Sequence, residues 1–506
     1  MSRFEFSNGV EKWNVFEVTV EGRSNKNPFV DYNIKGIFKG KNETVEIDGF
    51  YDGDGVYRVR FMPSFEGNYS FEVTGSFSDE HFSAEFTVTP PTTGNHGPVR
   101  VAYTYHFTYE DGTPYYPVGT TCYAWTHQSP DMQEKTLETL KKGYFNKIRF
   151  CIFPKHLDYN FNEPITYPYL GTPCDSSKIT KDNFMQYYGS NPENIWDFKR
   201  FNPEHFRLIE NRLRDLMDLG IEADIIVMHP YDRWGFSEMD AESDDLYWNY
   251  VIARFSAYRN VWWSLANEYD TMKKKTLADW ERYAGILCRE DAYNHLRSIH
   301  NLFNFYDYTR PWLTHCCIQR QPVNKIVERT NEWREIYQKP IVIDEMCYEG
   351  NIDHEWGNIS GKELVRRFWE TIIRGGYAGH GETYVHPKDQ LWWSHGGELH
   401  GESPERLKFL HKILCQTPVG GLRYSKTEHR TAVDETVFAP GAYRLIYYGV
   451  SRPQFMQFYY DDIHEYEVEV IDTWDMTIKK AGVFRGKFEI RLPGKEYMAV
   501  RIIRRT

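Results

Sequence analysis

The sequence predicts an α/β fold in which a central (β/α)8 TIM barrel is flanked by two all-β domains. Its 506 residues are too many for one hydrophobic core, so several domains are expected. Short segments of alternating polar and apolar residues fill both ends of the chain, whereas strands and helices alternate in the middle. Eight such repeats in series are typical of a parallel barrel. The predicted domains are 1–95, 96–415 and 416–506.

The two outer domains are predicted to be β-sandwiches. Their short alternating segments are separated by Gly, Asp and Pro turns, a spacing typical of sandwich strands. Strands are expected at 14–20, 56–61, 69–73, 443–448, 466–471 and 497–503. Residues 89–95, Thr-Pro-Pro-Thr-Thr-Gly-Asn, predict a linker between the first sandwich and the barrel.

The middle domain carries the strand and helix repeats. Its strands are expected at 115–121, 147–153, 221–228, 261–266, 296–299, 312–317, 340–344 and 376–380. Its helices are expected at 132–142, 203–219, 247–258, 276–294, 324–337, 362–374 and 404–414. A segment at 155–202, rich in Asn, Pro, Tyr and Gly, shows no regular pattern. Because irregular loops of this length are often functional, we expect it to form a wall of the site.

Two of the predicted strands are followed by a carboxylate, Glu268 after the fourth and Glu345 after the seventh. Active groups of a parallel barrel project from the carboxyl ends of its strands, so both acids are expected at one face. Retaining cleavage of a glycosidic bond needs one protonated and one ionised carboxyl group. A neighbouring negative charge raises the pKa of the acid, which allows it to act as the proton donor.

Other side chains near strand ends are candidates for binding a sugar. Asn267 is expected to bond the sugar 2-OH, and Arg149 to hold Glu345 ionised, although a structural ion pair would also explain Arg149. One of Trp125, Trp392 and Trp393 is expected to form a stacking floor for the sugar, with core packing as the alternative for any that points outward. The predicted substrate-binding residues are Asn267, Arg149, His229, Trp125, His300, His315, Tyr384 and Trp392.

Composition excludes several other functions. The net charge of −12 argues against nucleic acid and anionic membranes as partners. No segment approaches the roughly 20 apolar residues of a membrane span. The first residues lack a signal-peptide pattern, so a cytoplasmic protein is expected. The eight cysteines form no CxxC pair, and the histidines lack zinc-protease spacing, so no metal or cofactor is expected. The two β-domains offer surfaces for a homo-oligomer.

Four segments in order, 229–233, 264–269, 298–301 and 345–350, resemble the apiosidase-like (β/α)8 barrel family of glycoside hydrolases, of the clan A retaining type. The sandwich and the small C-terminal β-domain are similar to the domains that accompany such barrels. The resemblance implies that Glu268 is the acid/base and Glu345 the nucleophile. Glu349 lies four residues further on and is a competing nucleophile, but Glu345 directly follows the apolar strand.

The predicted function is therefore that of a retaining glycoside hydrolase acting on oligosaccharides without a cofactor. Two other functions are compatible with the same residues. One is a carbohydrate-binding protein on a barrel that has lost catalysis. The other is a lyase or transglycosylase on the same fold, which the products would distinguish.

Overall fold

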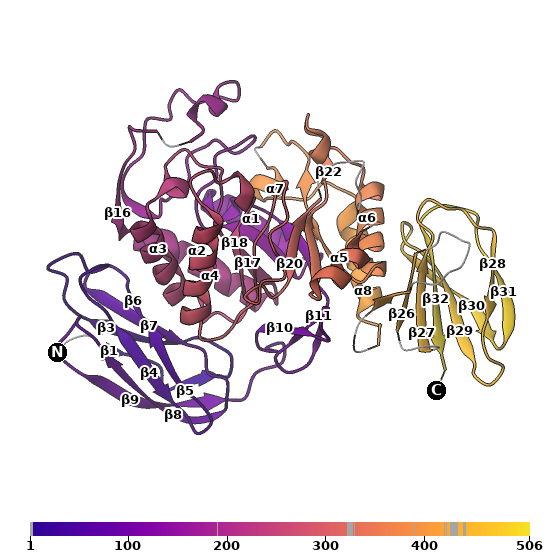
Figure 1. The fold of residues 1–506 in the computed structure, drawn as a ribbon, viewed down its shortest axis with the longest axis horizontal. Coiled ribbons are helices and arrows are strands. Elements are labelled where there is room, and N and C mark those ends of the chain that lie inside the picture. Colours follow the sequence, from indigo (N-terminus) through magenta and orange to yellow (C-terminus); the bar gives the residue numbers. More distant parts are fainter. Residues whose placement is uncertain are drawn as a thin grey trace.

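The computed structural model describes residues 4–189, 191–320, 327, 329–388, 390–418, 420, 422–425, 434–438 and 442–505. It contains a barrel between two β-domains, as the sequence predicts (Figure 1). In Figure 1 the N-terminal domain lies at the lower left, against the barrel helices α2, α3 and α4. The C-terminal domain lies at the right, beside α6 and α8.

Eight parallel strands form the barrel in the order β19-β18-β17-β14-β13-β23-β21-β20. An isolated bridge joins His300, two residues after β19, to Cys317 of β20, so the barrel is nearly closed. Every residue of β17, β18 and β21 is buried, as expected where both faces of a parallel sheet are covered. The strands are β13 Val118–Thr121, β14 Lys147–Cys151, β17 Glu222–Met228, β18 Val261–Ala266, β19 Arg297–Ser298, β20 Cys316–Gln319, β21 Ile341–Glu345 and β23 Tyr377–His380.

Helices surround the barrel, and local sequence explains where they begin. The Asn202 side chain caps α2, and a Thr276–Asp279 capping box begins α4. The α-helices are α1 Pro130–Leu140, α2 Pro203–Asp218, α3 Ala241–Phe255, α4 Leu277–Glu290, α5 Thr330–Tyr337, α6 Gly361–Ile373, α7 Trp392–His395 and α8 Ser403–Leu414. The 3-10 turns are η1 Trp125–His127, η2 Phe184–Tyr187, η3 Phe236–Glu238, η4 Tyr269–Thr271 and η5 Glu355–Gly357. The start of the helix expected at 324–337 lies partly outside the described residues. In the part of the chain described, no helix has the length and apolar character needed to cross a bilayer.

The N-terminal domain consists of two facing sheets, β1-β3-β7-β6 and β2-β9-β8-β4-β5. Their core is a cluster of stacked and edge-on phenylalanine rings that includes Phe16, Phe38 and Phe86. The strands are β1 Phe4–Glu5, β2 Gly9–Glu11, β3 Phe16–Glu21, β4 Lys35–Lys39, β5 Thr44–Asp48, β6 Phe50–Tyr51, β7 Val56–Phe61, β8 Gly67–Thr74 and β9 Phe82–Thr89. A small sheet follows, made of β10 Val99–Ala102, β11 His106–Tyr109 and β12 Pro114–Tyr115. Phe107 of this sheet packs against Trp262 and Tyr377 at the amino-terminal end of the barrel.

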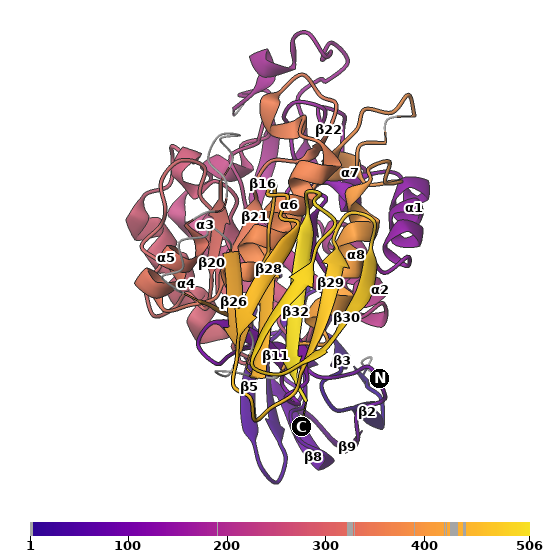
Figure 2. The same ribbon diagram turned by 90° about the vertical axis from the view of Figure 1, so that its right-hand side faces the viewer.

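The C-terminal domain pairs a six-stranded sheet, β25-β26-β27-β32-β29-β30, with the hairpin β28-β31. Figure 2 shows this domain in front of the barrel. Its strands are β25 Arg423–Tyr424, β26 Asp434–Phe438, β27 Tyr443–Tyr447, β28 Phe455–Tyr459, β29 Tyr466–Asp472, β30 Thr477–Phe484, β31 Lys487–Arg491 and β32 Met498–Arg504.

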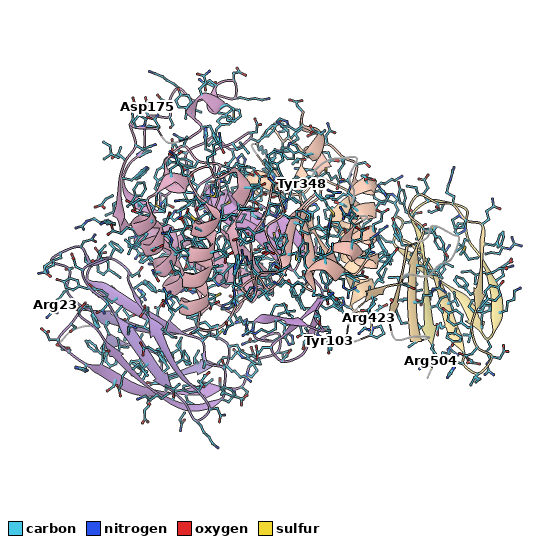
Figure 3. The ribbon with its side chains drawn as sticks, viewed as in Figure 1. Arg23, Tyr103, Asp175, Tyr348, Arg423 and Arg504 are labelled. Atoms are coloured by element: carbon cyan, nitrogen blue, oxygen red, sulfur yellow. The ribbon has the colours of Figure 1, made fainter. Side chains whose placement is uncertain are left out.

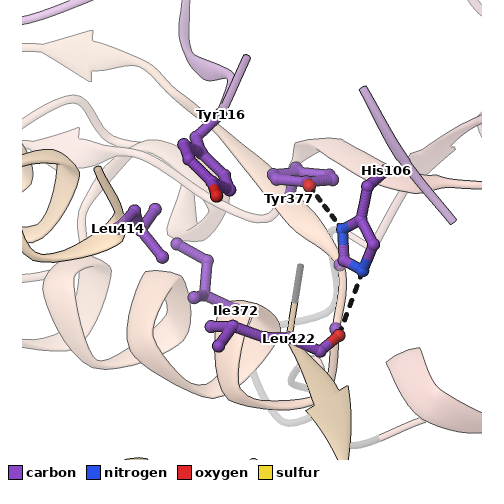
Figure 4. Close-up of a pocket in the computed structure, with 8 residues that line it drawn as sticks. His106, Tyr116, Ile372, Tyr377, Leu414 and Leu422 are labelled. Carbon is purple, nitrogen blue, oxygen red and sulfur yellow. Dashed lines mark hydrogen bonds between the residues drawn. The ribbon is translucent and has the colours of Figure 1, made fainter. Parts of the chain in front are cut away.

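The buried His106 links the segment that follows α8 to the barrel (Figure 4). His106 Nδ1 lies 2.7 Å from the Tyr377 hydroxyl, and its Nε2 lies 3.1 Å from the carbonyl oxygen of Leu422. Burial lowers the pKa of His106 to about 3, so the ring is neutral and acts as a fixed hydrogen-bonding link. The adjoining cavity of about 10 Å³ has room for one water molecule.

Two expectations about this architecture were wrong. The segment at 155–202 is not irregular throughout, because β15 Tyr169–Thr172 and β16 Ile195–Phe201 pair as an antiparallel hairpin. The sixth barrel strand is β20, Cys316–Gln319, rather than 312–317. This shift places His315 before the strand instead of near its carboxyl end.

A buried ionic network joins the first domain to the barrel. Arg60 of β7 lies 2.6 Å from Glu210 of α2, and Arg254 of α3 lies 2.6 Å from the same carboxylate. Arg254 also lies 2.8 Å from Asp52. Burial would raise the pKa of Glu210, but the two guanidinium groups outweigh it and lower that pKa to about 2. Glu210 is therefore the ionised centre of this domain contact.

We expect Glu210→Ala to lower the free energy of unfolding by about 3–5 kcal/mol, because it removes the buried carboxylate that two buried guanidinium groups share. Urea unfolding followed by fluorescence measures this change. The control is Glu46→Ala, which breaks an exposed pair with Lys35 and should cost less than about 1 kcal/mol. Equal effects of the two substitutions would contradict the role given to the network.

Candidate active site

Glu345 and Glu268 stand at the carboxyl ends of barrel strands. Glu345 is the last residue of β21, and Glu268 follows β18 by two positions. Both are largely buried, with 8% of Glu268 and 4% of Glu345 exposed. Glu268 has a left-handed backbone with φ of 48°. Such strained conformations of residues other than glycine cluster at functional sites.

A β-bulge explains how β21 directs two consecutive acids inward. Ile343 pairs with Ile318 of β20, but Glu345 pairs with Gln319, so Asp344 is an extra residue on β21. Side chains normally alternate between the two faces of a strand, and a bulge changes the direction of one of them. Asp344 contacts Lys147 inside the barrel, and Glu345 also points inward.

One chain of polar contacts links the two carboxylates through tyrosine hydroxyls. Tyr231 donates to Glu268, and the Asn267 amide donates to the Tyr231 hydroxyl at 3.0 Å. The amide oxygen of Asn267 lies 3.4 Å from the Tyr123 hydroxyl. Tyr123 in turn donates to Glu345.

A second chain links the same carboxylates from the other side. Gln319, at the end of β20, is hydrogen-bonded to Glu268. Its side-chain oxygen lies 3.1 Å from His300 Nε2, which lies 3.2 Å from Glu345 Oε1. The two chains together form a closed ring of side chains, which we call the carboxylate ring. This ring fixes the position of each acid relative to the other.

The two acids of the carboxylate ring have opposite pKa shifts. Burial, aided by the charge of Glu345, raises the pKa of Glu268 to about 7. Burial also acts on Glu345, but His300, Arg149 and Tyr123 outweigh it and lower the pKa of Glu345 to about 2. The Arg149 guanidinium lies 3.2 Å from Glu345. Between these two values one carboxyl group is protonated and the other ionised, the arrangement of an acid and a nucleophile.

A buried lysine faces the same tyrosines. The Lys155 ammonium lies 3.8 Å from the Tyr123 ring centre, 4.5 Å from that of Tyr231 and 4.1 Å from that of Trp393. Within the described residues this ammonium has no hydrogen-bond partner. Burial lowers the pKa of Lys155 to about 8. Its positive charge lowers the pKa of Glu268 and thus limits the rise that burial causes.

Three of the predicted binding residues lie in this assembly. Asn267 is a member of the carboxylate ring, His300 is another, and Arg149 contacts Glu345 from β14. His229 lies behind Tyr231. Its Nε2 lies 3.0 Å from the Phe153 carbonyl oxygen, and its ring stacks on Tyr231. His229 therefore supports the tyrosine that bonds to Glu268.

The two predicted tryptophans lie in the core instead. Trp125 is fully buried against Phe150, and the Trp392 indole donates to Thr120 Oγ1 at 2.7 Å. These contacts correct the expectation that Trp125 or Trp392 forms the stacking floor. The neighbouring Trp393 contacts Lys155, because adjacent residues of the short helix α7 point in different directions.

His315 and Tyr384 also lie away from the two acids. His315 precedes β20 and packs against Phe107 and Trp262 at the amino-terminal end of the barrel. The Tyr384 hydroxyl lies 3.4 Å from Glu349. The Glu349 carboxylate accepts backbone N–H groups of Glu402 and Ser403 at the start of α8. The Glu349 carboxylate therefore caps the start of α8 and does not belong to the carboxylate ring.

Sequence reasoning missed five residues that contact the acids or their partners. Each follows or ends a barrel strand, which is the one signal that could have found them. Three of the five are tyrosines, and because the chain has 37 tyrosines, residue type alone could not single them out. The missed residues are Tyr123, Lys155, Tyr231, Gln319 and Tyr348. Figure 3 shows Tyr348 at the upper end of the barrel, the end that carries the site.

Three ranges of the chain match known protein families. Residues 102–413 match the family described as "Apiosidase-like, catalytic domain". Residues 9–76 match a domain of unknown function, DUF5060, and residues 433–503 match another, DUF5605. No curated protein matches this chain.

Solved structures agree with this assignment. A protein of Bacteroides vulgatus ATCC 8482, described as a candidate glycoside hydrolase, is 35% identical over 99% of this chain and 100% of its own, with a TM-score of 0.90. A glycoside hydrolase of family 5 from the same organism is 15% identical over 81% of this chain and 94% of its own, with a TM-score of 0.58, and shares the fold. The chain therefore belongs to the apiosidase-like family, and it is a glycoside hydrolase.

Proposed function

We propose that the enzyme cleaves O-glycosidic bonds of oligosaccharides with retention of configuration, using Glu345 as nucleophile and Glu268 as acid/base. The observation that supports this most directly is the carboxylate ring, which holds two acids of opposite protonation in one site. Double displacement requires this pair, because one carboxyl group must donate a proton while the other attacks.

In the first step the Glu345 carboxylate bonds to the anomeric carbon while the bond to the leaving oxygen breaks. Glu268 gives its proton to that oxygen, so the alcohol leaves neutral and Glu345 becomes a glycosyl ester. The negative charge on Glu345 is then gone, which lowers the pKa of Glu268. Glu268 can now take a proton from the water that attacks the anomeric carbon and releases the sugar.

The surrounding residues have matching parts in this cycle. Arg149, His300 and Tyr123 stabilise the Glu345 carboxylate, both as the nucleophile and again when it is released. The Asn267 amide adjoins both acids through the carboxylate ring. It is therefore placed to bond the sugar 2-OH, an interaction that strengthens in the transition state.

We expect Glu268→Ala to lower turnover of glycosides with poor leaving groups by about 10²–10⁴-fold, because the proton donor is lost. The turnover of activated aryl glycosides by this variant should fall less in the first step. Added azide should restore release of the sugar. Glu345→Ala should lose at least about 10⁴-fold on both substrates. Steady-state kinetics give these values, and proton NMR of the first sugar released reports its anomeric configuration.

Glu349→Gln is the matched control, because Glu349 caps α8 instead of joining the carboxylate ring. It should keep far more activity than Glu345→Gln. Wild-type rates in both Glu268→Ala and Glu345→Ala would refute the assignment. Sugar binding with no product from any glycoside would instead indicate a non-catalytic protein.

The pH dependence of kcat/KM should follow the two acids. Because Glu268 must carry a proton, activity should fall as the pH rises through about 7. Because Glu345 must be ionised, activity should persist in acid until the pH approaches its pKa of about 2, as long as the fold survives. A high-pH limb near the ordinary glutamate pKa of about 4.3 would contradict this.

Lys155→Met should move the high-pH limb upward by about one unit, because the positive charge that lowers the pKa of Glu268 is removed. Lys155→Arg keeps the charge and should stay closer to the wild type. The profile of kcat/KM against pH distinguishes this electrostatic effect from a loss of packing, which would lower the rate without shifting the limb. Identical limbs in Lys155→Met and wild type would show that the lysine does not act on Glu268.

A further inference from the structure

A chain of polar side chains leads from Glu345 through His300 and Cys317 to Asp344. His300 Nε2 lies 3.2 Å from Glu345 Oε1, and its other nitrogen, Nδ1, lies 3.1 Å from Cys317 Sγ. The Cys317 thiol donates to Asp344 Oδ2 at 3.0 Å. All four residues are buried, with at most 4% of any of them exposed. Because solvent does not reach the chain, its hydrogens must be shared out among protein groups.

The Cys317 thiol has one hydrogen for two polar neighbours. Burial and the charge of Asp344 raise the pKa of Cys317 well above its ordinary value, so the thiol keeps that hydrogen. Burial also acts on Asp344, but Lys147 and Arg149 outweigh it and lower the pKa of Asp344. An ionised carboxylate can only accept, so the S–H hydrogen belongs to the bond with Asp344. The sulfur must then accept a hydrogen from Nδ1 of His300.

The second nitrogen of His300 also faces acceptors. Nε2 lies beside Glu345 Oε1 and 3.1 Å from the side-chain oxygen of Gln319. The Gln319 side chain lowers the pKa of Glu268 through a hydrogen bond, as a donating amide N–H does. Its oxygen is therefore the atom that turns to His300. A bare Nε2 would point its lone pair at two oxygens, so this nitrogen also needs a hydrogen.

We propose that Asp344 and Cys317 are positioning residues that hold His300 as an imidazolium, with a hydrogen on each ring nitrogen, beside the nucleophile. This rests on the proposed function and deepens it. The positive ring lies between two carboxylates, with Glu345 at one nitrogen and Asp344 beyond the thiol at the other. The imidazolium keeps Glu345 ionised for attack and stabilises it again when the sugar is released.

The charges around the chain favour a cationic ring. Arg149 and His300 approach the same oxygen of Glu345 from different strands. Glu268 faces the ring through the Gln319 amide. Three carboxylates in this layer share two cations in direct contact, which leaves one negative charge for His300 to balance. These groups are Glu345, Asp344 and Asp224, with Arg149 and Lys147.

Nuclear magnetic resonance of protein labelled with nitrogen-15 histidine tests the assignment, because the nitrogen shift distinguishes an N–H from a bare nitrogen. At about pH 7 the wild type should show hydrogens on both nitrogens of His300. The chain has 18 histidines, and the signals lost in His300→Gln identify this one. Cys317→Ala should leave His300 neutral, with the hydrogen on Nε2 alone. Cys317→Ser should keep both hydrogens, because a hydroxyl also donates once and accepts.

Kinetics on an activated aryl glycoside report what the charge does for the nucleophile. Cys317→Ala should lower kcat/KM about tenfold, the effect of one hydrogen bond to a charged group, and Cys317→Ser should recover most of it. Cys316→Ala is the matched control. Cys316 is the preceding residue of β20, equally buried, and it packs in the hydrophobic core, so this substitution removes the same sulfur without touching the chain.

Two results would overturn the proposal. One is a wild-type His300 with a single hydrogen at about pH 7, or signals that Cys317→Ala does not change. The other is an equal loss of kcat/KM in Cys317→Ala, Cys317→Ser and Cys316→Ala, which would show an effect of packing. If the wild type cleaves no glycoside, the proposed function fails, while the histidine signals still decide whether Asp344 and Cys317 hold His300 as an imidazolium.

Discussion

The site depends on keeping two carboxyl groups close together in opposite protonation states. Two like charges 4 Å apart repel by about 4 kcal/mol at an effective dielectric constant of 20, so burial alone would leave the shared proton on either acid. The protein removes this ambiguity because its positive charges act unequally on the two carboxyl groups. Arg149 contacts Glu345 directly and lowers its pKa, whereas Glu268 receives hydrogen bonds from Tyr231 and Gln319 and its pKa is raised by burial and by the charge of Glu345. The proton therefore belongs to Glu268.

Lys155 shows why the second cation is held by aromatic rings. An ammonium paired directly with Glu268 would hold that acid ionised and remove the proton that the proposed mechanism requires. Between three rings the charge is stabilised by cation–π contacts, each worth up to about 2 kcal/mol when desolvated. Two of these rings belong to the tyrosines whose hydroxyls bond to the acids. The charge thus influences Glu268 at a distance that leaves the proton in place.

The sequence predicted the barrel and the two acids because both depend on local patterns. Apolar runs of strand length marked β18 and β21, and each led directly to a carboxylate. His315 was misplaced because β20 begins four residues later than expected, which changes the end of the barrel at which the residue lies. Tyr123 and Lys155 could not be predicted in the same way. Their roles come from loops after different strands meeting in space, and no spacing along the chain encodes that meeting.

The bulge at Asp344 connects the catalytic layer to the layer beneath it. Asp344 of β21 lies 2.8 Å from Lys147 of β14, which lies 2.7 Å from Asp224 of β17, so three barrel strands, of which only β14 and β17 are neighbours, are joined under the site. Lys147 and Arg149 are two positions apart on β14 and therefore share the inner face. A regular β21 would send Asp344 and Glu345 to opposite faces, so either Lys147 would lose one of its two carboxylates or Arg149 would lose Glu345. The extra residue lets one strand place a carboxylate beside each cation, which makes Glu345 part of the packing of the barrel.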